Sequence, residues 1–263
     1  METPDQLQHH IHMKKGDVGR YVLLPGDPGR SEKIAQYFDN PQFVAQHREY
    51  VTYTGTLLGE KVSVTSTGIG CPSTAIAVEE LIAIGADTFI RVGTSGGMQP
   101  GIKTGDVAVV TGAIRDEGTT LHYLPPEFPA VADVDVVLAL EEGARRAGIR
   151  SWRGISQSKD SFYGEVEPYR MPVDKRLEER WKAWIAGGAV CSEMEAAAIF
   201  IISSIHRKRA SGVMLMGSMA EEDQPHTPEE WKAMEALFDV DRAIRVAIEG
   251  LKALIEQDRQ RGA

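Results

Sequence analysis

Arginines stand close to glycine-rich segments in this sequence, and the combination is suited to binding an anion. Arg30 ends the run Pro25-Gly26-Asp27-Pro28-Gly29-Arg30, Arg48 lies in His47-Arg48-Glu49-Tyr50, and Arg91 opens Arg91-Val92-Gly93-Thr94-Ser95-Gly96-Gly97. A guanidinium group can contact two phosphate oxygens at once, and glycine turns expose backbone N–H donors. Each arginine alone is more typical of a surface ion pair. Arginine with glycine at the carboxyl ends of predicted strands favours an anion site, because open α/β sheets bind ligands there.

A second segment with chemical potential follows the predicted strand Val62–Thr65. It reads Ser66-Thr67-Gly68-Ile69-Gly70-Cys71-Pro72-Ser73-Thr74-Ala75-Ile76-Ala77-Val78-Glu79-Glu80-Leu81. The glycines predict a turn, and the apolar periodicity after it predicts a helix that begins at Pro72 or Ser73, with serine suited to the cap. A strand, a glycine turn and a helix N-terminus together aim backbone N–H groups at an anionic or polar ligand.

A third segment, Cys191-Ser192-Glu193-Met194-Glu195-Ala196-Ala197-Ala198, predicts the start of an apolar helix. Ser192 is the expected N-cap, and acidic residues in the first turn complement the helix dipole. Capping accounts for Glu193. It explains less well why Met194 stands between two glutamates, so the segment is also a candidate binding site.

Composition narrows the class of protein. The chain has 263 residues, 42% of them hydrophobic, a formal net charge of −9 and a pI near 5.3. The acidic balance argues against a general nucleic-acid binder, and the apolar share suffices for a large core. Two cysteines, Cys71 and Cys191, lack disulfide-framework or metal-ligand spacing and are expected to be small buried residues. No signal region or membrane-spanning run is evident, so we expect a cytoplasmic protein without a membrane partner.

The elements that must position these residues alternate between strands and helices. Strands are predicted at 21–24, 43–45, 51–57, 61–65, 88–92, 107–111, 154–157 and 213–216, and helices at 31–38, 73–84, 134–147, 175–186, 193–205 and 228–257. This alternation predicts an α/β fold with a sheet covered on both faces. No linker, repeat or change in composition divides the chain. We therefore expect one domain over residues 1–263, with a solvated C-terminal tail from about residue 259.

The run from Ser66 to Leu81 resembles, position by position, the signature of the nucleoside phosphorylase family, which includes uridine phosphorylase and the hexameric purine nucleoside phosphorylases. The resemblance covers the N-terminal two-thirds and the Glu193–Glu195 segment, and it is closest to the uridine phosphorylase members. It implies a phosphorylase/hydrolase-like α/β domain with a mixed central sheet flanked by helices. It also implies phosphate-dependent cleavage of a ribonucleoside to free base and ribose 1-phosphate. Inorganic phosphate is then a cosubstrate, and no cofactor is required.

The resemblance also assigns roles to residues that match the family's motifs. Gly26, Arg30, Arg91 and Thr94 would hold phosphate, and Arg48 would reach the same site from a neighbouring subunit. Met194 and Glu195, with Glu193, would contact ribose. His10 would cross a dimer interface to the ribose 5′-hydroxyl, although a disordered histidine cluster is the alternative. Arg91 and Glu195 are the expected catalytic residues, positioning phosphate and stabilising positive charge on the sugar.

The resemblance weakens at the base pocket. Phe162 matches an aromatic residue that stacks on the base, but the glutamine and arginine that read uracil in uridine phosphorylases are replaced by Glu165 or Val166, and by Pro168. An ionised glutamate only accepts hydrogen bonds, so Glu165 would suit the two-donor edge of guanine better than uracil. Alternatively, Glu165 points to solvent. The preferred base therefore stays open between uridine and a purine nucleoside such as guanosine or inosine.

Two other classes of function are compatible with parts of this sequence. A hydrolytic nucleosidase of the same fold would use water, which needs no trio of guanidinium groups at Arg30, Arg48 and Arg91. A non-catalytic nucleoside-binding protein would be consistent with the altered base pocket.

Assembly and ion binding follow from the same resemblance. Because His10 and Arg48 would act across an interface, we expect a homo-oligomer built from dimers, as in the family's hexamers. Glu49, Ile69 and Ser73 match positions that hold a potassium ion at the dimer interface of uridine phosphorylases. A carboxylate, a carbonyl and a hydroxyl are hard oxygen ligands suited to such a cation. The alternative is that Glu49 pairs with a basic neighbour and Ser73 caps its helix.

Overall fold

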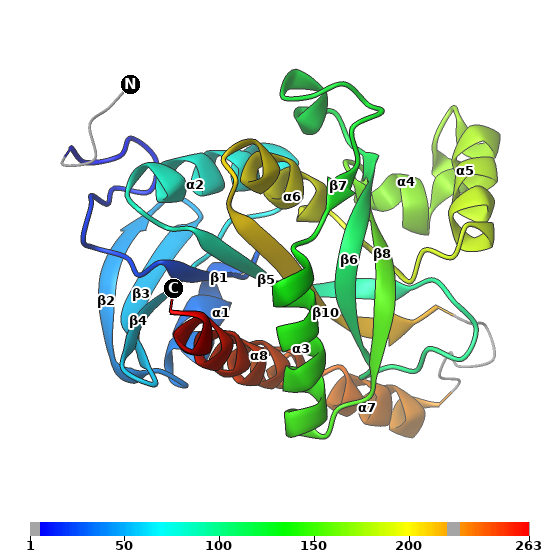
Figure 1. Cartoon of the computed structure of the whole chain (residues 1–263). Helices are drawn as coiled ribbons and strands as arrows, with labels where there is room; N and C mark the ends of the chain where they lie inside the picture. Colours follow the sequence, from blue (N-terminus) through cyan, green and yellow to red (C-terminus); the bar gives the residue numbers. More distant parts are fainter. Residues whose placement is uncertain (1–5, 220–226, 263) are drawn as a thin grey trace.

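A mixed sheet forms the centre of the molecule. The computed structural model describes residues 6–219 and 227–262, and within these ranges the sheet has ten strands (Figure 1). They are β1 (Tyr21–Leu24), β2 (Asp39–His47), β3 (Tyr50–Leu57), β4 (Glu60–Thr65), β5 (Thr88–Gly97), β6 (Val107–Asp116), β7 (Ala130–Val131), β8 (Ser151–Lys159), β9 (Cys191–Glu193) and β10 (Arg209–Ser218).

The strand order is β10-β6-β8-β9-β5-β1-β4-β3-β2, with β7 beside β6. β10 also pairs with β5, so the half of the sheet from β5 to β10 closes on itself, while β1 to β4 form an open flank. Parallel pairs such as β1–β5 and β5–β10 stand beside antiparallel pairs such as β3–β4 and β6–β10. The predicted mixed central sheet is confirmed.

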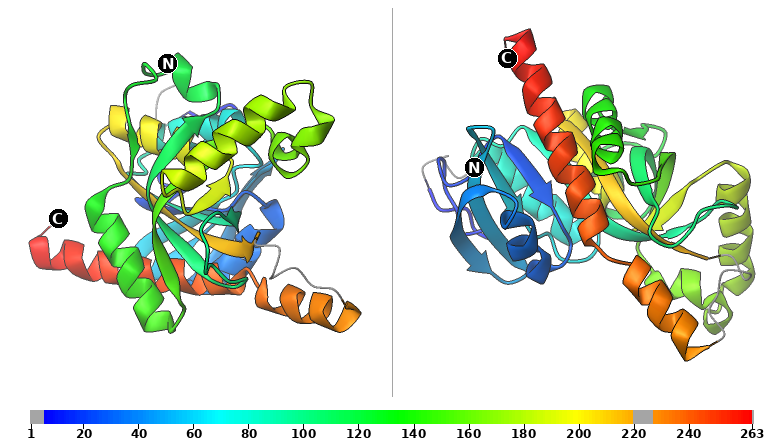
Figure 2. Two further views of the ribbon diagram at one scale, coloured as in Figure 1. Left: turned by 90° about the vertical axis from the view of Figure 1, so that its right-hand side faces the viewer. Right: turned by 90° about the horizontal axis from the view of Figure 1, so that it is seen from below.

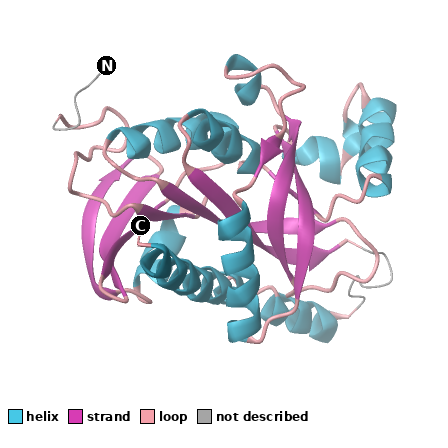
Figure 3. Ribbon diagram, in the orientation of Figure 1, coloured by secondary structure: helices cyan, strands magenta, loops and turns pink. Residues whose placement is uncertain are grey.

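Helices cover both faces of this sheet (Figure 3). They are α1 (Pro28–Ala35), α2 (Cys71–Ala83), α3 (Val134–Ala147), α4 (Phe162–Val166), α5 (Asp174–Ala186), α6 (Ala196–Ile205), α7 (Pro228–Leu237) and α8 (Asp241–Arg261), with short 3-10 turns η1 (Thr119–His122) and η2 (Pro168–Arg170). α2 and α6 enclose one apolar core, and α1, α3 and α8 enclose the other. α4, α5 and α7 lie on the side of the molecule opposite β2–β4 (Figure 2).

Local signals place several elements as predicted. Strand β1 and helix α3 have the predicted bounds. In α3 the Asp133 carboxylate accepts from the Val136 N–H at 3.1 Å, and Gly148 ends the helix in the left-handed region with φ 65°. None of the described helices is long and apolar enough to cross a membrane.

The central strand is longer than predicted. β5 continues through the glycines to Gly97, so Arg91 lies within a strand and the segment after it is not a turn. The glycines of β5 instead allow close packing against neighbouring side chains. A Cβ atom on Gly93 would lie 2.5 Å from the Met214 sulfur of the paired strand β10, closer than any real contact.

Several other boundaries differ by a few residues, and two predictions are wrong in the type or the number of elements. Residues 191–193 form strand β9, which pairs with β5 and β8, and the helix starts only at Ala196. The predicted helix 228–257 is two helices separated at residues 238–240. α8 then continues to Arg261, so the expected tail from residue 259 is the exposed last turn of a helix. Arg259 pairs there with Glu60 at 3.1 Å, and Arg261 pairs with Asp135.

Candidate active site

A cleft of about 1010 Å³ opens where β1, β5, β9 and β10 meet the N-terminus of α2. It contains most of the residues that the sequence singles out. Its lining includes Gly26, Arg30, Glu49, Ile69, Arg91, Thr94, Phe162, Glu165, Glu193, Met194 and Glu195. Segments separated by more than 150 residues in the chain therefore form one site.

Arg30 and Arg91 both line the cleft, as do Gly26 and Thr94. Arg91 is 4% exposed, and Arg30 donates from Nη1 to the carbonyl of Val92 at 3.1 Å. Nη1 of Arg91 and Nε of Arg30 are buried and have no partner in the part of the chain that the structure describes. Burial and, secondarily, the charge of Arg91 lower the pKa of Arg30. A buried N–H donor without a partner is costly, so these two donors favour the binding of an anion at the Arg30–Arg91 end of the cleft.

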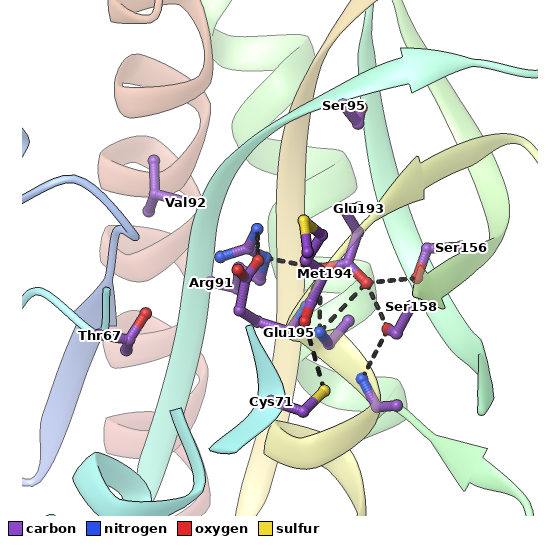
Figure 4. A network of polar contacts seen from close by, with 12 residues as sticks. Thr67, Cys71, Arg91, Val92, Ser95, Ser156, Ser158, Glu193, Met194 and Glu195 are labelled. Carbon is purple, nitrogen blue, oxygen red and sulfur yellow. Dashed lines mark hydrogen bonds and ion pairs between the residues drawn. The ribbon is translucent and has the colours of Figure 1, made fainter. Parts of the chain in front are cut away.

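Two buried carboxylates hold Arg91 in place (Figure 4). Nε of Arg91 lies 2.9 Å from Oε2 of Glu193, and Nη2 pairs with Oε2 of Glu195. Burial favours loss of the charge on Arg91, but Glu195 and Glu193 outweigh it, so the pKa of Arg91 is raised. Burial, and the charge of Glu193, raise the pKa of Glu195.

Glu193 is engaged by several donors of the protein itself. Its carboxylate accepts from the backbone N–H groups of Glu195 and Ala196 at 2.8 and 2.9 Å, and from the Ser158 hydroxyl. Glu193 therefore provides the acceptors at the start of α6. The predicted cap, Ser192, lies in β9 and does not cap the helix, because β9 pairs with β5 on one side and β8 on the other.

The N-terminus of α2 is hydrogen-bonded to the Met194–Glu195 segment. The Gly70 N–H donates to Oε1 of Glu195 at 2.6 Å, and the Cys71 thiol donates to the carbonyl of Met194 at 3.3 Å. Cys71 and Cys191 are both fully buried, and burial raises the pKa of each thiol, that of Cys191 to about 12. The prediction that they are buried residues is confirmed, and neither thiol is activated as a nucleophile.

The other end of the cleft combines an aromatic face with an ion pair. Phe162 and Glu165 lie on α4, and the Phe162 side chain is 53% exposed. Nζ of Lys159 lies 3.1 Å from Oε1 of Glu165, with both side chains 8% exposed. The Ser192 hydroxyl is 2.6 Å from Lys159 and 2.7 Å from Glu165.

The solvent-facing alternative for Glu165 is therefore wrong. Lys159, which was not among the predicted site residues, also lines the cleft from the end of β8. Its position three residues before Phe162, the predicted base-stacking residue, was the available signal. Only the pairing of β8 with β9 reveals that the lysine, Ser192 and Glu165 form one group.

Two predicted residues do not line this cleft. Arg48 is exposed at the β2–β3 turn with φ 52°, and His10 pairs through Nδ1 with Oε1 of Glu80 at 2.6 Å. Neither belongs to the lining of the cleft in its own chain. This placement is the one expected of residues that would serve a neighbouring subunit.

The residues predicted to bind potassium gather around Gly68. The Ser73 hydroxyl donates to Oε1 of Glu49 at 2.7 Å, and this bond lowers the pKa of Glu49. A Cβ atom on Gly68, which has φ 70°, would lie 2.8 Å from Cγ of Glu49, so only glycine fits there. The helix cap is Gly70, so Ser73 is not a cap as the alternative required. The described residues contain no cluster of three or more His, Cys, Asp or Glu side chains suited to a metal ion.

Comparison with known proteins agrees with this geometry. The sequence pattern of the phosphorylase superfamily matches residues 20–256. A uridine phosphorylase of Treponema pallidum is 52% identical over 257 residues, covering 97% of this chain and 96% of the relative. One of Thermococcus kodakarensis is 44% identical over 270 residues, covering 99% and 91%. A guanosine phosphorylase of Halorubrum lacusprofundi is 36% identical over 249 residues, covering 94% and 99%.

Proposed function

The chain belongs to the phosphorylase superfamily, and from this membership we propose that it is a uridine phosphorylase. It is a pentosyltransferase that cleaves the glycosidic bond of uridine with inorganic phosphate and releases uracil and ribose 1-phosphate. The observation that carries the proposal is a pair of arginines beside two carboxylates in the cleft, the buried Arg91 and the partly buried Arg30. Each has a buried donor without a partner among the described residues.

Phosphate would bind at the Arg30–Arg91 end, with Gly26 and Thr94 as further contacts. The unpaired Nη1 of Arg91 and Nε of Arg30 are donors that such an anion can satisfy. A phosphate oxygen held there would attack C1′ from the face opposite the base. Holding the two reactants together is a large part of the rate enhancement, because it removes the entropic cost of their encounter.

Ribose would lie over Met194 and Glu195. One carboxylate oxygen of Glu195 accepts from Gly70 and the other pairs with Arg91, and each oxygen can still accept from a ribose hydroxyl. The carboxylates and the phosphate would stabilise the positive charge that develops on the sugar. Because Glu193 already accepts from several protein donors, we assign it the role of holding Arg91 and the start of α6.

The base would stack on Phe162 with its polar edge toward Lys159 and Glu165. The ion pair presents a donor and an acceptor side by side, which matches an adjacent carbonyl and N–H of uracil. As the bond to C1′ breaks, negative charge moves onto the base. The Lys159 ammonium is then the cation placed to stabilise it.

Guanosine is the second candidate substrate. Guanine also has a carbonyl next to an N–H, so the Lys159–Glu165 pair suits it as well, and one relative is a guanosine phosphorylase. Hydrolysis is disfavoured because water needs no buried guanidinium donors. A test of base release from uridine, thymidine, inosine, guanosine and adenosine, each with and without phosphate, separates these functions. Release that does not require phosphate would contradict phosphorolysis, and absence of release would favour a binding protein.

We further propose that the enzyme is a homo-oligomer built from dimers, with hexamers as the expected assembly, and that it acts in the cytoplasm. The exposed position of Arg48 and the pairing of His10 with Glu80 support shared sites, since neither side chain lines the cleft of its own chain. Glu49, Ser73 and the carbonyl of Ile69 would bind potassium at the same interface. Their proximity around Gly68 supports this, and two subunits would supply six oxygens.

A further inference from the structure

A second opening reaches the Arg30–Arg91 end of the cleft. This opening, the α1–α7 groove, has a volume of about 510 Å³ and lies between α1 on one side and α7 with the α7–α8 junction on the other. Arg30, Thr94 and Phe238 line both the groove and the main cleft. The two cavities therefore meet at residues that we assign to phosphate binding.

Two cations, Lys33 and Arg30, line the α1 side of this groove, and a third, Arg91, lines the main cleft beyond Arg30. Lys33 is exposed, Arg30 is partly buried, and Arg91, on β5, is 4% exposed. Residues three apart in a helix lie on the same face, so Lys33 and Arg30 lie along one side of α1. Burial, and secondarily the charge of Arg91, lower the pKa of Arg30, as expected for two neighbouring cations at the end of one cleft.

The opposite wall of the groove is acidic and partly aromatic. It carries Glu235 and Asp239, so an anion in the groove is repelled from that side and attracted to α1. Phe238 stands at the junction of the two cavities, where a Cβ atom on Gly217 would lie 3.4 Å from its ring. The groove thus leads an anion past Phe238 to Arg30.

Building on the proposed phosphorolysis, we propose that inorganic phosphate enters through the α1–α7 groove while the nucleoside enters through the main cleft. Phosphate passes from Lys33 to Arg30 and then to Arg91. A nucleoside that lies between Phe162 and Glu195 covers the phosphate end from the cleft side only. Phosphate can therefore bind to, and leave from, an enzyme that already holds its nucleoside.

The first test is the order of binding in the intact wild-type enzyme. The enzyme is mixed with uridine at rising concentrations, phosphate is then added, and the first turnover is followed by rapid quenching. We expect the rate of the first turnover to be independent of the uridine concentration once the nucleoside site is saturated. A rate that falls as uridine rises would overturn the proposal, because phosphate would then have to wait for the nucleoside to leave. Absence of phosphorolysis under every condition would instead overturn the proposed function.

The second test reverses the charge at the mouth of the groove. Lys33→Glu should lower kcat/KM for phosphate by roughly five- to tenfold at low ionic strength, and the effect should fade near 1 M salt. The value of kcat/KM for uridine at saturating phosphate should not change, and Lys33→Gln should be intermediate. Lys175→Glu, on the exposed surface of α5, makes the same change in net charge and should leave both values unaltered. Equal effects of the two charge reversals, or no effect of Lys33→Glu, would overturn the route.

Discussion

The Nε atom of Arg91 lies 2.9 Å from Oε2 of Glu193, in an ion pair whose side chains are 5% and 0% exposed. Because Glu193 also accepts from the backbone at the start of α6, it ties β5 to that helix at the floor of the cleft. Removing one member of such a pair leaves an uncompensated buried charge, which typically destabilises a protein by about 3–5 kcal/mol.

Replacement of Arg91 should therefore impair both binding and folding. We expect Arg91→Ala to lower kcat/KM for phosphate by roughly 30-fold or more, since loss of a charged contact costs about 2–5 kcal/mol. Arg91→Lys keeps the charge but cannot make a bidentate contact. Compared with Arg91→Ala, it should therefore recover much of the lost stability and less of the lost activity. Thermal melting measured beside the kinetics separates the two effects. Full phosphorolysis by Arg91→Ala at low phosphate would remove this residue from the phosphate site.

Lys159 should act on the chemical step. Lys159→Met removes the cation next to the departing base, and we expect kcat for uridine to fall about 100-fold. Lys182→Met, on the exposed face of α5, is the matched control and should be unaffected. Glu165→Gln supplies a donor as well as an acceptor, so it should raise the preference for uridine over guanosine. An unchanged kcat in Lys159→Met would contradict the proposed role.

Asp258 should make the fold sensitive to acid. It joins α8 to β1 and β10, accepting from Tyr21 Oη at 2.6 Å and from Arg209 Nη2 at 2.6 Å. Burial would raise the pKa of Asp258, but these bonds outweigh it, so the pKa is lowered. A depressed folded-state pKa gives stability that is present above the unfolded value, near 3.9, and lost as pH falls through the folded value.

Asp258→Asn should thus cost about 3 kcal/mol at pH 7 and less at pH 3. Urea unfolding of both proteins at the two pH values measures the difference. Burial, together with the hydrogen bond to Asp258, raises the pKa of Tyr21 to about 12, so the Tyr21 hydroxyl stays protonated and remains a donor across this pH range. A penalty of equal size at both pH values would show that the charge of Asp258 is unimportant.

Sharing of sites between subunits can be tested by mixing two inactive variants. If Arg48 acts across an interface, mixed dimers of Arg48→Ala and Arg91→Ala contain one intact site. Random reassembly should then restore up to roughly a quarter of the wild-type activity. If Arg48 acts within its own chain, every site in the mixture lacks one arginine, and activity should stay at the level of the single variants.

Potassium should support phosphate binding if it occupies the Glu49–Ser73 site. Replacing it with a large organic cation at matched ionic strength should weaken phosphate binding or lower the Tm, because the ion would steady the Gly68–Gly70 turn next to Arg48. Ser73→Ala removes one ligand and should reduce this dependence. If the phosphate affinity and the Tm are identical with both cations, potassium does not bind at the Glu49–Ser73 site.

Local patterns determined much of this architecture. Tyr21–Leu24 is a short, continuous apolar run that begins with an aromatic and a β-branched residue. Residues 134–147 have a helical apolar period with a cap at each end, so neighbouring residues suffice to specify both elements. The arginines near glycines, and the glutamates around Met194, were also recognisable as candidate binding residues from their types alone, and most of them line the cleft.

Contacts between distant segments decided the rest. Glu193 was expected in a helix, but it lies in β9 because that short segment pairs with β5 and β8. The burial and ion pairing of Glu165, which lies on α4, depend on Lys159 of β8 and Ser192 of β9. The C-terminal helical pattern contains a break at Phe238, where the chain lines both the cleft and the α1–α7 groove. A charged side chain or a strand edge contacts its long-range partner only when the sheet assembles. Local periodicity and propensity therefore do not indicate which partner that will be.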